Sequence, residues 1–166
     1  MQRTADGELV VIHDETVNRT TNGTGAVARL TSDEIRALDA SAGLPGFGGT
    51  RVPTLRQVME LLRGTGLQVN VELKTSIERY PGIEREALTL VDELGMRDQA
   101  VWSSFRHASV TDLVGDVAAE QLALLMSDVL VRTWTVDDPE HLQMAARAGV
   151  DAIITNVPDV ARALLG

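Results

Sequence analysis

The sequence predicts an α/β fold built from parallel βα units, of the kind that closes into a TIM (β/α)8 barrel. From residue 68 onward, apolar strand-like runs alternate with amphipathic helical segments, which favours a parallel sheet with crossover helices. Four apolar runs also stop at polar residues, and strands of that design deliver functional groups to the carboxyl-terminal rim of a parallel barrel. The runs lead into His13-Asp14, Glu72-Leu73-Lys74, Trp134-Thr135 and Thr155-Asn156.

The N-terminal third is expected to hold a hairpin, two loops and two helices. Asp6-Gly7 is a turn signal between two short strands, Met1–Thr4 and Leu9–Ile12. Hydroxyl residues that can cap a helix precede two helical segments, and loops rich in Asn, Thr, Gly or Pro lie before each of them. The expected order is a loop over 18–29, a helix begun at Thr31 or Ser32 and running through Leu38, a loop over 41–53, and a helix over 55–62 capped by Thr54.

The remainder of the chain reads as strand, helix, strand. The predicted strands are Gln68–Leu73, Ala100–Phe105, Gln121–Met126, Leu130–Val136 and Asp151–Thr155. The predicted helices are Ile83–Leu94, Ala108–Val114, Pro139–Ala148 and Pro158–Leu165.

One junction conflicts with a parallel barrel. Only Ser127-Asp128-Val129 separates the strands that end at Met126 and begin at Leu130, whereas a parallel crossover needs about a dozen residues. A hairpin would fit the length, but no Asn-Gly-type turn is present. A complete eight-unit barrel takes about 250 residues, and this chain has 166. We therefore interpret 1–166 as a single partial barrel domain that lacks its first βα unit and about one internal βα unit near 127–130.

Composition narrows the classes of partner. The chain is 44% apolar and 23% charged, as soluble globular proteins are, and its net charge of -9 argues against nucleic acid as a partner. Cysteine is absent, which excludes disulfides and thiolate metal sites. No run of 18 apolar residues and no signal peptide is seen, so stable membrane insertion is not expected and a cytoplasmic location is the default.

Three residues could carry chemistry at the expected rim. His13 ends the run Leu9–Ile12 and could act as a general acid or base, although a histidine satisfied by a backbone carbonyl is the alternative. Glu72 and Lys74 lie two positions apart, so both side chains point to one face of their strand. Glu72 suits a hard divalent cation and Lys74 a phosphate oxygen, while a structural salt bridge is the alternative.

Other conspicuous residues carry weaker signals. Trp134 on its strand is a core residue from sequence alone, and Ser104-Phe105 ends another predicted strand. Arg19 is interpreted as ordering the Asn/Thr/Gly loop, with a phosphate contact as the alternative. His107 and His141 begin predicted helices and are interpreted as surface residues.

The order and the residues of these motifs resemble those of the glycerophosphodiester phosphodiesterase family, whose members have barrels of the phospholipase C-like phosphodiesterase type. The resemblance covers nearly the whole chain and rests on His13-Asp14 with the following Asn18-Arg19-Thr20-Thr21, on Glu72-Leu73-Lys74, on Ser104-Phe105 and on Trp134-Thr135-Val136. It implies that His13 is one of two catalytic histidines. It also implies that Glu72 is a metal ligand, that Lys74 lies near the phosphate, and that Trp134 contacts substrate at the mouth of the pocket. Phe105 would form part of the pocket wall and contact substrate there.

The resemblance further implies segments that this chain lacks. A first strand ending in His-Arg-Gly and a second carrying Glu-x-Asp would supply the other histidine, a phosphate-binding arginine and two metal carboxylates. The expected function is metal-dependent hydrolysis of small glycerophosphodiesters to glycerol 3-phosphate and an alcohol, with Mg²⁺ or Ca²⁺ bound weakly or not at all and little activity in the 166 residues alone. The alternatives are a non-catalytic barrel fragment that binds a partner or forms homo-oligomers, and a phospholipase D-like lipid hydrolase.

Overall fold

The structure is a computed structural model, which describes residues 1–125, 132–133, 139–140, 142–143, 152–153, 160 and 163. The chain divides into two compact units, residues 1–125 and residues 126–166. The division falls beside the junction at which the sequence predicts a missing segment.

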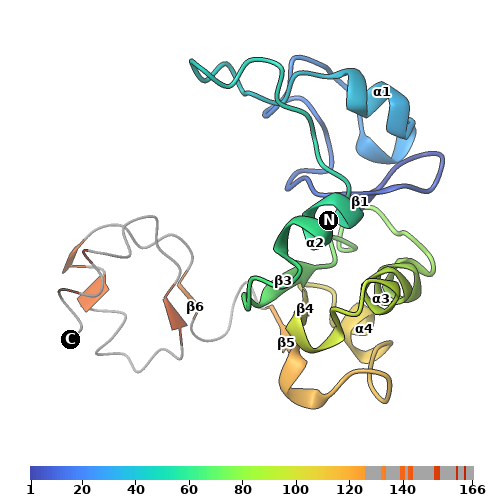
Figure 1. Cartoon of the computed structure of the whole chain (residues 1–166), viewed down its shortest axis with the longest axis vertical. Coiled ribbons are helices and arrows are strands. Elements are labelled where there is room, and N and C mark those ends of the chain that lie inside the picture. Colours follow the sequence, from blue (N-terminus) through green and yellow to red (C-terminus); the bar gives the residue numbers. More distant parts are fainter. Residues whose placement is uncertain are drawn as a thin grey trace. The chain divides into compact units, whose positions relative to one another are not determined.

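The first unit contains a three-stranded parallel sheet in the order β3-β4-β5. Strand β3 spans Val69–Glu72, β4 spans Ala100–Ser104 and β5 spans Leu122–Leu124. Helix α3, Ile83–Glu93, connects β3 to β4, and α4, His107–Thr111, connects β4 to β5 (Figure 1). These connections confirm the predicted βα units. The described strands do not close a barrel.

Two of the predicted helix starts are confirmed by their caps. Helix α1, Ser32–Ala37, begins after Thr31, and α2, Leu55–Leu62, begins after Thr54. Each threonine side chain accepts a hydrogen bond from the backbone N–H three residues on, and the side chain of that residue accepts one from the backbone N–H of the threonine, so both form capping boxes. The short 3-10 helices η1, η2 and η3 span Val27–Arg29, Arg97–Gln99 and Ala119–Gln121.

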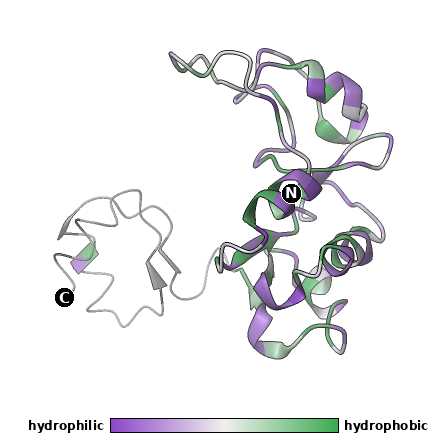
Figure 2. Ribbon diagram, viewed as in Figure 1, coloured by the Kyte–Doolittle hydropathy of each residue, from purple (hydrophilic) through white to green (hydrophobic). Residues whose placement is uncertain are grey.

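Two clusters of buried apolar side chains hold the first unit together. The larger lies under the sheet and joins it to α2 and α3, and Figure 2 shows apolar and polar residues alternating along these helices. Trp102 of β4 is fully buried in this cluster. The smaller cluster packs around the segment that follows β2, and its buried members are Val10, Ile12, Val17, Val27, Ile35 and Val52. It gives the loop that carries His13 a core of its own.

The N-terminal hairpin forms where Asp6-Gly7 predicts it. Strand β1, Gln2–Arg3, pairs antiparallel with β2, Leu9–Val10, and Gly7 adopts a φ of +96° in the turn. The second strand is shorter than predicted because the N–H of Val11 turns away to donate to the carbonyl of Pro53 at 2.9 Å. The helix expected over Ala108–Val114 likewise begins at His107 and ends at Thr111.

In the second unit, β6, Arg132–Thr133, pairs in parallel with β7, Ala152–Ile153. Both lie within predicted strands. Trp134, His141 and the predicted missing segment near 127–130 lie outside the described residues, as does the exit of the last strand at 155–158.

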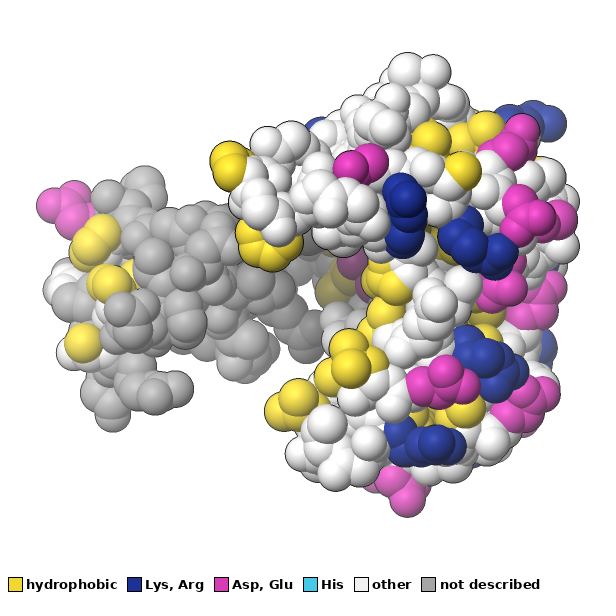
Figure 3. All heavy atoms as spheres, turned by 45° about the horizontal axis from the view of Figure 1, so that its top comes forward, with side chains coloured by type: hydrophobic (Ala, Val, Ile, Leu, Met, Phe, Trp, Pro, Cys, Tyr) yellow, Lys and Arg dark blue, Asp and Glu magenta, His cyan; other side chains and the backbone are white. Residues whose placement is uncertain are grey.

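The surface of the described chain mixes charges. On the face in Figure 3, basic and acidic side chains lie next to one another over residues 1–125. Within residues 1–125, ion pairs join such side chains, most of them at exposed positions. In the part of the chain that is described, no helix has the length and apolarity needed to cross a bilayer.

Candidate active site

Glu72 and Lys74 form an ion pair at the carboxyl end of β3. The Lys74 ammonium lies 2.9 Å from Oε1 of Glu72, and the two side chains are only 12% and 21% exposed, respectively. Their neighbours Val71 and Leu73 are buried in the larger cluster, so strand alternation directs the charged pair to the opposite face of the sheet. The structure thus brings together two predicted site residues, in the contact that the salt-bridge alternative describes.

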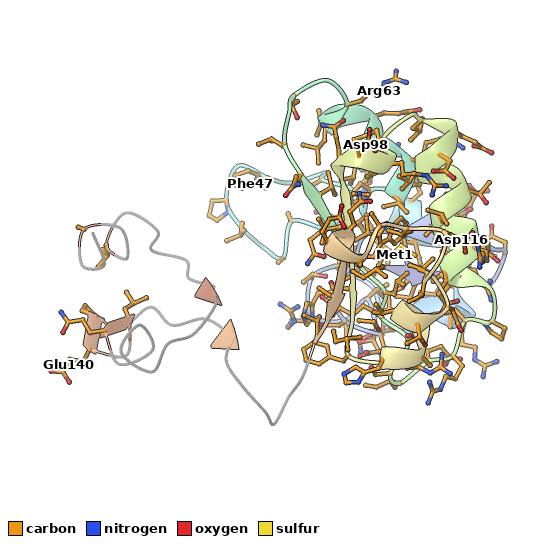
Figure 4. All side chains as sticks on the ribbon, turned by 90° about the horizontal axis from the view of Figure 1, so that it is seen from below. Met1, Phe47, Arg63, Asp98, Asp116 and Glu140 are labelled. Atoms are coloured by element: carbon orange, nitrogen blue, oxygen red, sulfur yellow. The ribbon has the colours of Figure 1, made fainter. Side chains whose placement is uncertain are left out.

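Two main-chain hydrogen bonds attach the N-terminal hairpin to this strand end. The backbone nitrogen of Met1 donates to the carbonyl of Glu72 at 2.6 Å, and the N–H of Lys74 donates to the carbonyl of Met1 at 3.3 Å. This is the pattern of two parallel strands, with Met1 beside Leu73. Met1 is buried and lies within the packed body of the first unit in Figure 4, in contrast to Phe47, which is 61% exposed. The hairpin that leads to His13 therefore starts beside Lys74.

His13 is paired with the carboxylate that follows it. Its Nδ1 lies 2.7 Å from Oδ1 of Asp14, and Arg19 donates to both carboxylate oxygens at 2.7 and 2.9 Å. The Arg19 guanidinium and then the His13 ring hold the pKa of Asp14 far below its ordinary range. Because an ionised carboxylate can only accept, Nδ1 of His13 carries its proton towards Asp14, and in the neutral ring Nε2 has the lone pair. Such a ring can act as a proton acceptor at Nε2.

A buried glutamine ties His13 to the hairpin. Gln2 is completely buried, and its side-chain nitrogen lies 3.5 Å from the carbonyl of His13. Its side-chain oxygen accepts a hydrogen bond of 2.8 Å from the hydroxyl of Tyr80. Burial raises the pKa of Tyr80 to about 12, so the hydroxyl stays protonated and keeps donating. Sequence reasoning missed Gln2 and Tyr80 because 78 residues separate them.

The other predicted residues fall outside this arrangement. Phe105 follows β4 directly and is partly buried. Arg19 is bound to Asp14, which supports the interpretation that it orders its loop. His107 is exposed, as predicted, with Nε2 at 3.2 Å from the carbonyl of Leu125. Trp134, the predicted substrate contact, is outside the described residues.

The described residues do not fit a divalent metal site. Among them, no three His, Asp or Glu side chains group so that they could hold an ion. Glu72, the predicted ligand, has one carboxylate oxygen engaged by the Lys74 ammonium. A hard cation takes six or more oxygen ligands, so one partly engaged carboxylate is too little.

The convergence of His13 and the Glu72–Lys74 pair on one cavity stays a prediction. A cavity of about 510 Å³ lies between the turn of the hairpin and the chain that follows β3. Arg3, Asp6, Arg29 and Tyr80 are among the residues that line it, and none of the three predicted residues is.

The Arg19–Asp14 contact predicts a titration. With Arg19→Gln, we expect the pKa of Asp14 to rise towards the ordinary value of about 3.9. A carboxyl whose folded pKa is depressed contributes stability above its unfolded pKa, and that contribution is lost as the pH falls through the folded pKa. Carboxyl ¹³C NMR measures the titration, and Arg36→Gln, which removes the partner of Asp33 instead, is the control. An Asp14 titration that Arg19→Gln leaves unmoved contradicts the assignment.

Known proteins resemble the chain over most of its length. The family described as glycerophosphoryl diester phosphodiesterase matches residues 1–129. A glycerophosphodiester phosphodiesterase of Caldanaerobacter subterraneus subsp. tengcongensis is 36% identical over 196 aligned positions, which cover 96% of this chain and 81% of that protein.

Solved structures agree. The crystal structure of a glycerophosphodiester phosphodiesterase from Agrobacterium tumefaciens superposes with a TM-score of 0.69 at 29% identity, covering 98% of this chain and 84% of the other. A phosphodiesterase of Oleispira antarctica, solved with the product sn-glycerol-3-phosphate, shares the fold at 22% identity, with a TM-score of 0.73 over 98% of this chain and 81% of that one. These neighbours are TIM barrels. The chain belongs to the glycerophosphoryl diester phosphodiesterase family.

Proposed function

We propose that the protein acts on glycerophosphodiesters, cleaving the phosphodiester to glycerol 3-phosphate and an alcohol. The family is one of phosphoric diester hydrolases, and a relative of the same name is 36% identical. The observation that carries the proposal is the partly buried Glu72–Lys74 pair, to which main-chain hydrogen bonds attach the hairpin leading to the His13–Asp14 pair. Phosphoryl transfer is helped by a cation that offsets negative charge and by a group that accepts and donates protons. The Lys74 ammonium and the oriented His13 imidazole are groups of these two kinds.

Each residue has a role in this proposal. The Lys74 ammonium binds a phosphate oxygen and offsets the negative charge that develops on the phosphoryl group. Nε2 of His13 accepts a proton from the attacking group, which is water or the substrate's own glycerol hydroxyl. Alternatively, it donates a proton to the oxygen of the leaving alcohol when the phosphorus–oxygen bond breaks. Asp14 holds the imidazole in the tautomer that this step requires. Trp134 and Phe105 are proposed as walls that contact the substrate.

We also propose that the 166 residues form an incomplete barrel. The alignment to the Caldanaerobacter relative spans 196 positions, so at least 30 of them have no counterpart in this chain of 166 residues. The family match ends at residue 129, within the stretch near 127–130 where the sequence predicts a missing βα segment. In this proposal 1–166 is one partial domain.

The first test is product binding. Isothermal titration calorimetry with glycerol 3-phosphate should show binding that Lys74→Met weakens by about 10–100-fold, because a hydrogen bond to a charged group contributes about 1.5–3 kcal/mol. Arg63→Met is the matched control, since it removes an exposed cation that no carboxylate pairs with among the described residues. Equal affinities for Lys74→Met and the unchanged chain contradict the proposed function.

The second test is turnover. Choline release from glycerophosphocholine and from lysophosphatidylcholine is measured with Mg²⁺, Ca²⁺ or chelator. We expect slow turnover that prefers glycerophosphocholine and gains less than tenfold from either cation, because the described residues group too few ligands for one. Rapid cation-dependent turnover contradicts the incomplete site, and a preference for lysophosphatidylcholine favours the lipid hydrolase instead.

A further inference from the structure

Three buried hydroxyls meet behind the end of β3, on segments far apart in the sequence. Thr75 follows Lys74, Ser104 ends β4 and Ser109 lies in α4, and none is more than 1% exposed. The Thr75 hydroxyl lies 2.7 Å from that of Ser109 and 3.5 Å from that of Ser104. Buried polar groups of this kind are stable only when each has a hydrogen-bond partner.

The Ser104 end of this cluster fixes the direction of its hydrogen bonds, and the Arg106 end is compatible with it. At one end, Nη1 of Arg106, which can only donate, lies 3.3 Å from the Ser109 hydroxyl. At the other end, the Ser104 hydroxyl donates at 2.7 Å to the carbonyl of Leu73, which can only accept. Each hydroxyl has one proton to give. The bonds therefore run from Arg106 through Ser109, Thr75 and Ser104 to the carbonyl of Leu73.

That carbonyl belongs to the peptide that leads into Lys74. The oxygen of this peptide accepts from the Ser104 hydroxyl and, at 3.1 Å, from the N–H of Thr75. The N–H of the same peptide belongs to Lys74 and donates to the carbonyl of Met1. A peptide is planar, so holding both ends fixes the orientation of the peptide on the N-terminal side of the Lys74 Cα. The residue after Lys74 is held too, because the Thr75 hydroxyl bonds Ser109.

We propose that Thr75, Ser104 and Ser109 are positioning residues that hold the Lys74 ammonium in place for the phosphate. The inference rests on the proposed function, in which Lys74 is the group that binds the phosphate oxygen. Arg106 polarises the hydroxyls from the α4 side, so the segment that follows β4 sets the geometry of a side chain just after β3. None of these residues contacts the phosphate in this arrangement.

The test uses the fact that Lys74 is the chain's only lysine. Labelling with ¹³C-lysine gives a single set of lysine signals, which reports Lys74 directly. Thr75→Val removes the hydroxyl and keeps the shape. We expect it to shift the Lys74 Cε signal and to weaken glycerol 3-phosphate binding by about tenfold, within the range of coupling between neighbours. Thr75→Ser keeps the hydroxyl and should restore both. Ser109→Ala is a second variant for use should Thr75→Val fail to fold.

A double-mutant cycle separates positioning from a general structural role. In the Lys74→Met background, Thr75→Val should leave the residual affinity unchanged, because there is no ammonium left to position. Thr111→Val is the matched control: its hydroxyl donates only within its own helix, to the carbonyl of Ala108 at 2.9 Å.

The outcomes distinguish the two proposals. Should Lys74→Met weaken binding while Thr75→Val has the same effect with and without Lys74, the positioning role is overturned and the function stands. Should Lys74→Met leave binding unchanged, the proposed function fails first.

Discussion

The two main-chain hydrogen bonds between Met1 and the end of β3 are the contact on which the candidate site depends. They align the N-terminal hairpin with the parallel sheet, at the edge where Glu72 and Lys74 emerge. A two-stranded hairpin alone is only marginally stable in water, and these bonds add to the apolar packing of Met1 and Leu9 in the larger cluster. The buried Gln2 side chain then extends the attachment towards His13. Thus a few backbone and amide contacts connect the segment that carries His13 to the strand end that carries Glu72 and Lys74.

Opposed charges at the site are balanced locally. Glu72 pairs with Lys74, and Asp14 pairs with Arg19, so both of these cations have a carboxylate partner. Asp14 also contacts Nδ1 of His13. A phosphodiester that binds Lys74 must compete with Glu72 for the ammonium. The Glu72 carboxylate would then need another cation beside it. Among the described residues, no group of His, Asp and Glu side chains assembles a site for a divalent ion that could serve as that cation.

Local patterns predicted much of the fold. Asp6-Gly7 indicated the hairpin, Thr31 and Thr54 indicated the helix starts, and the apolar runs indicated parallel strands. The spacing of two on a strand predicted that Glu72 and Lys74 share a face, and their ion pair was the alternative to separate metal and phosphate roles. The contacts that position the site could not be predicted, because they join distant segments: Gln2 with Tyr80, and Thr75 with Ser109. The prediction of strand ends was also wrong where the next backbone N–H donates to a residue outside the sheet. The N–H of Val11, for example, donates to the carbonyl of Pro53.

The central claim is that His13 and Lys74 border a single phosphate. Chain labelled with ¹³C in its one lysine and three histidines allows both side chains to be followed while glycerol 3-phosphate is added. We expect the Lys74 and His13 signals to shift together along one saturation curve, with the His107 signals unmoved. Signals of Lys74 and His13 that respond at different concentrations, or a response from only one of them, would contradict it.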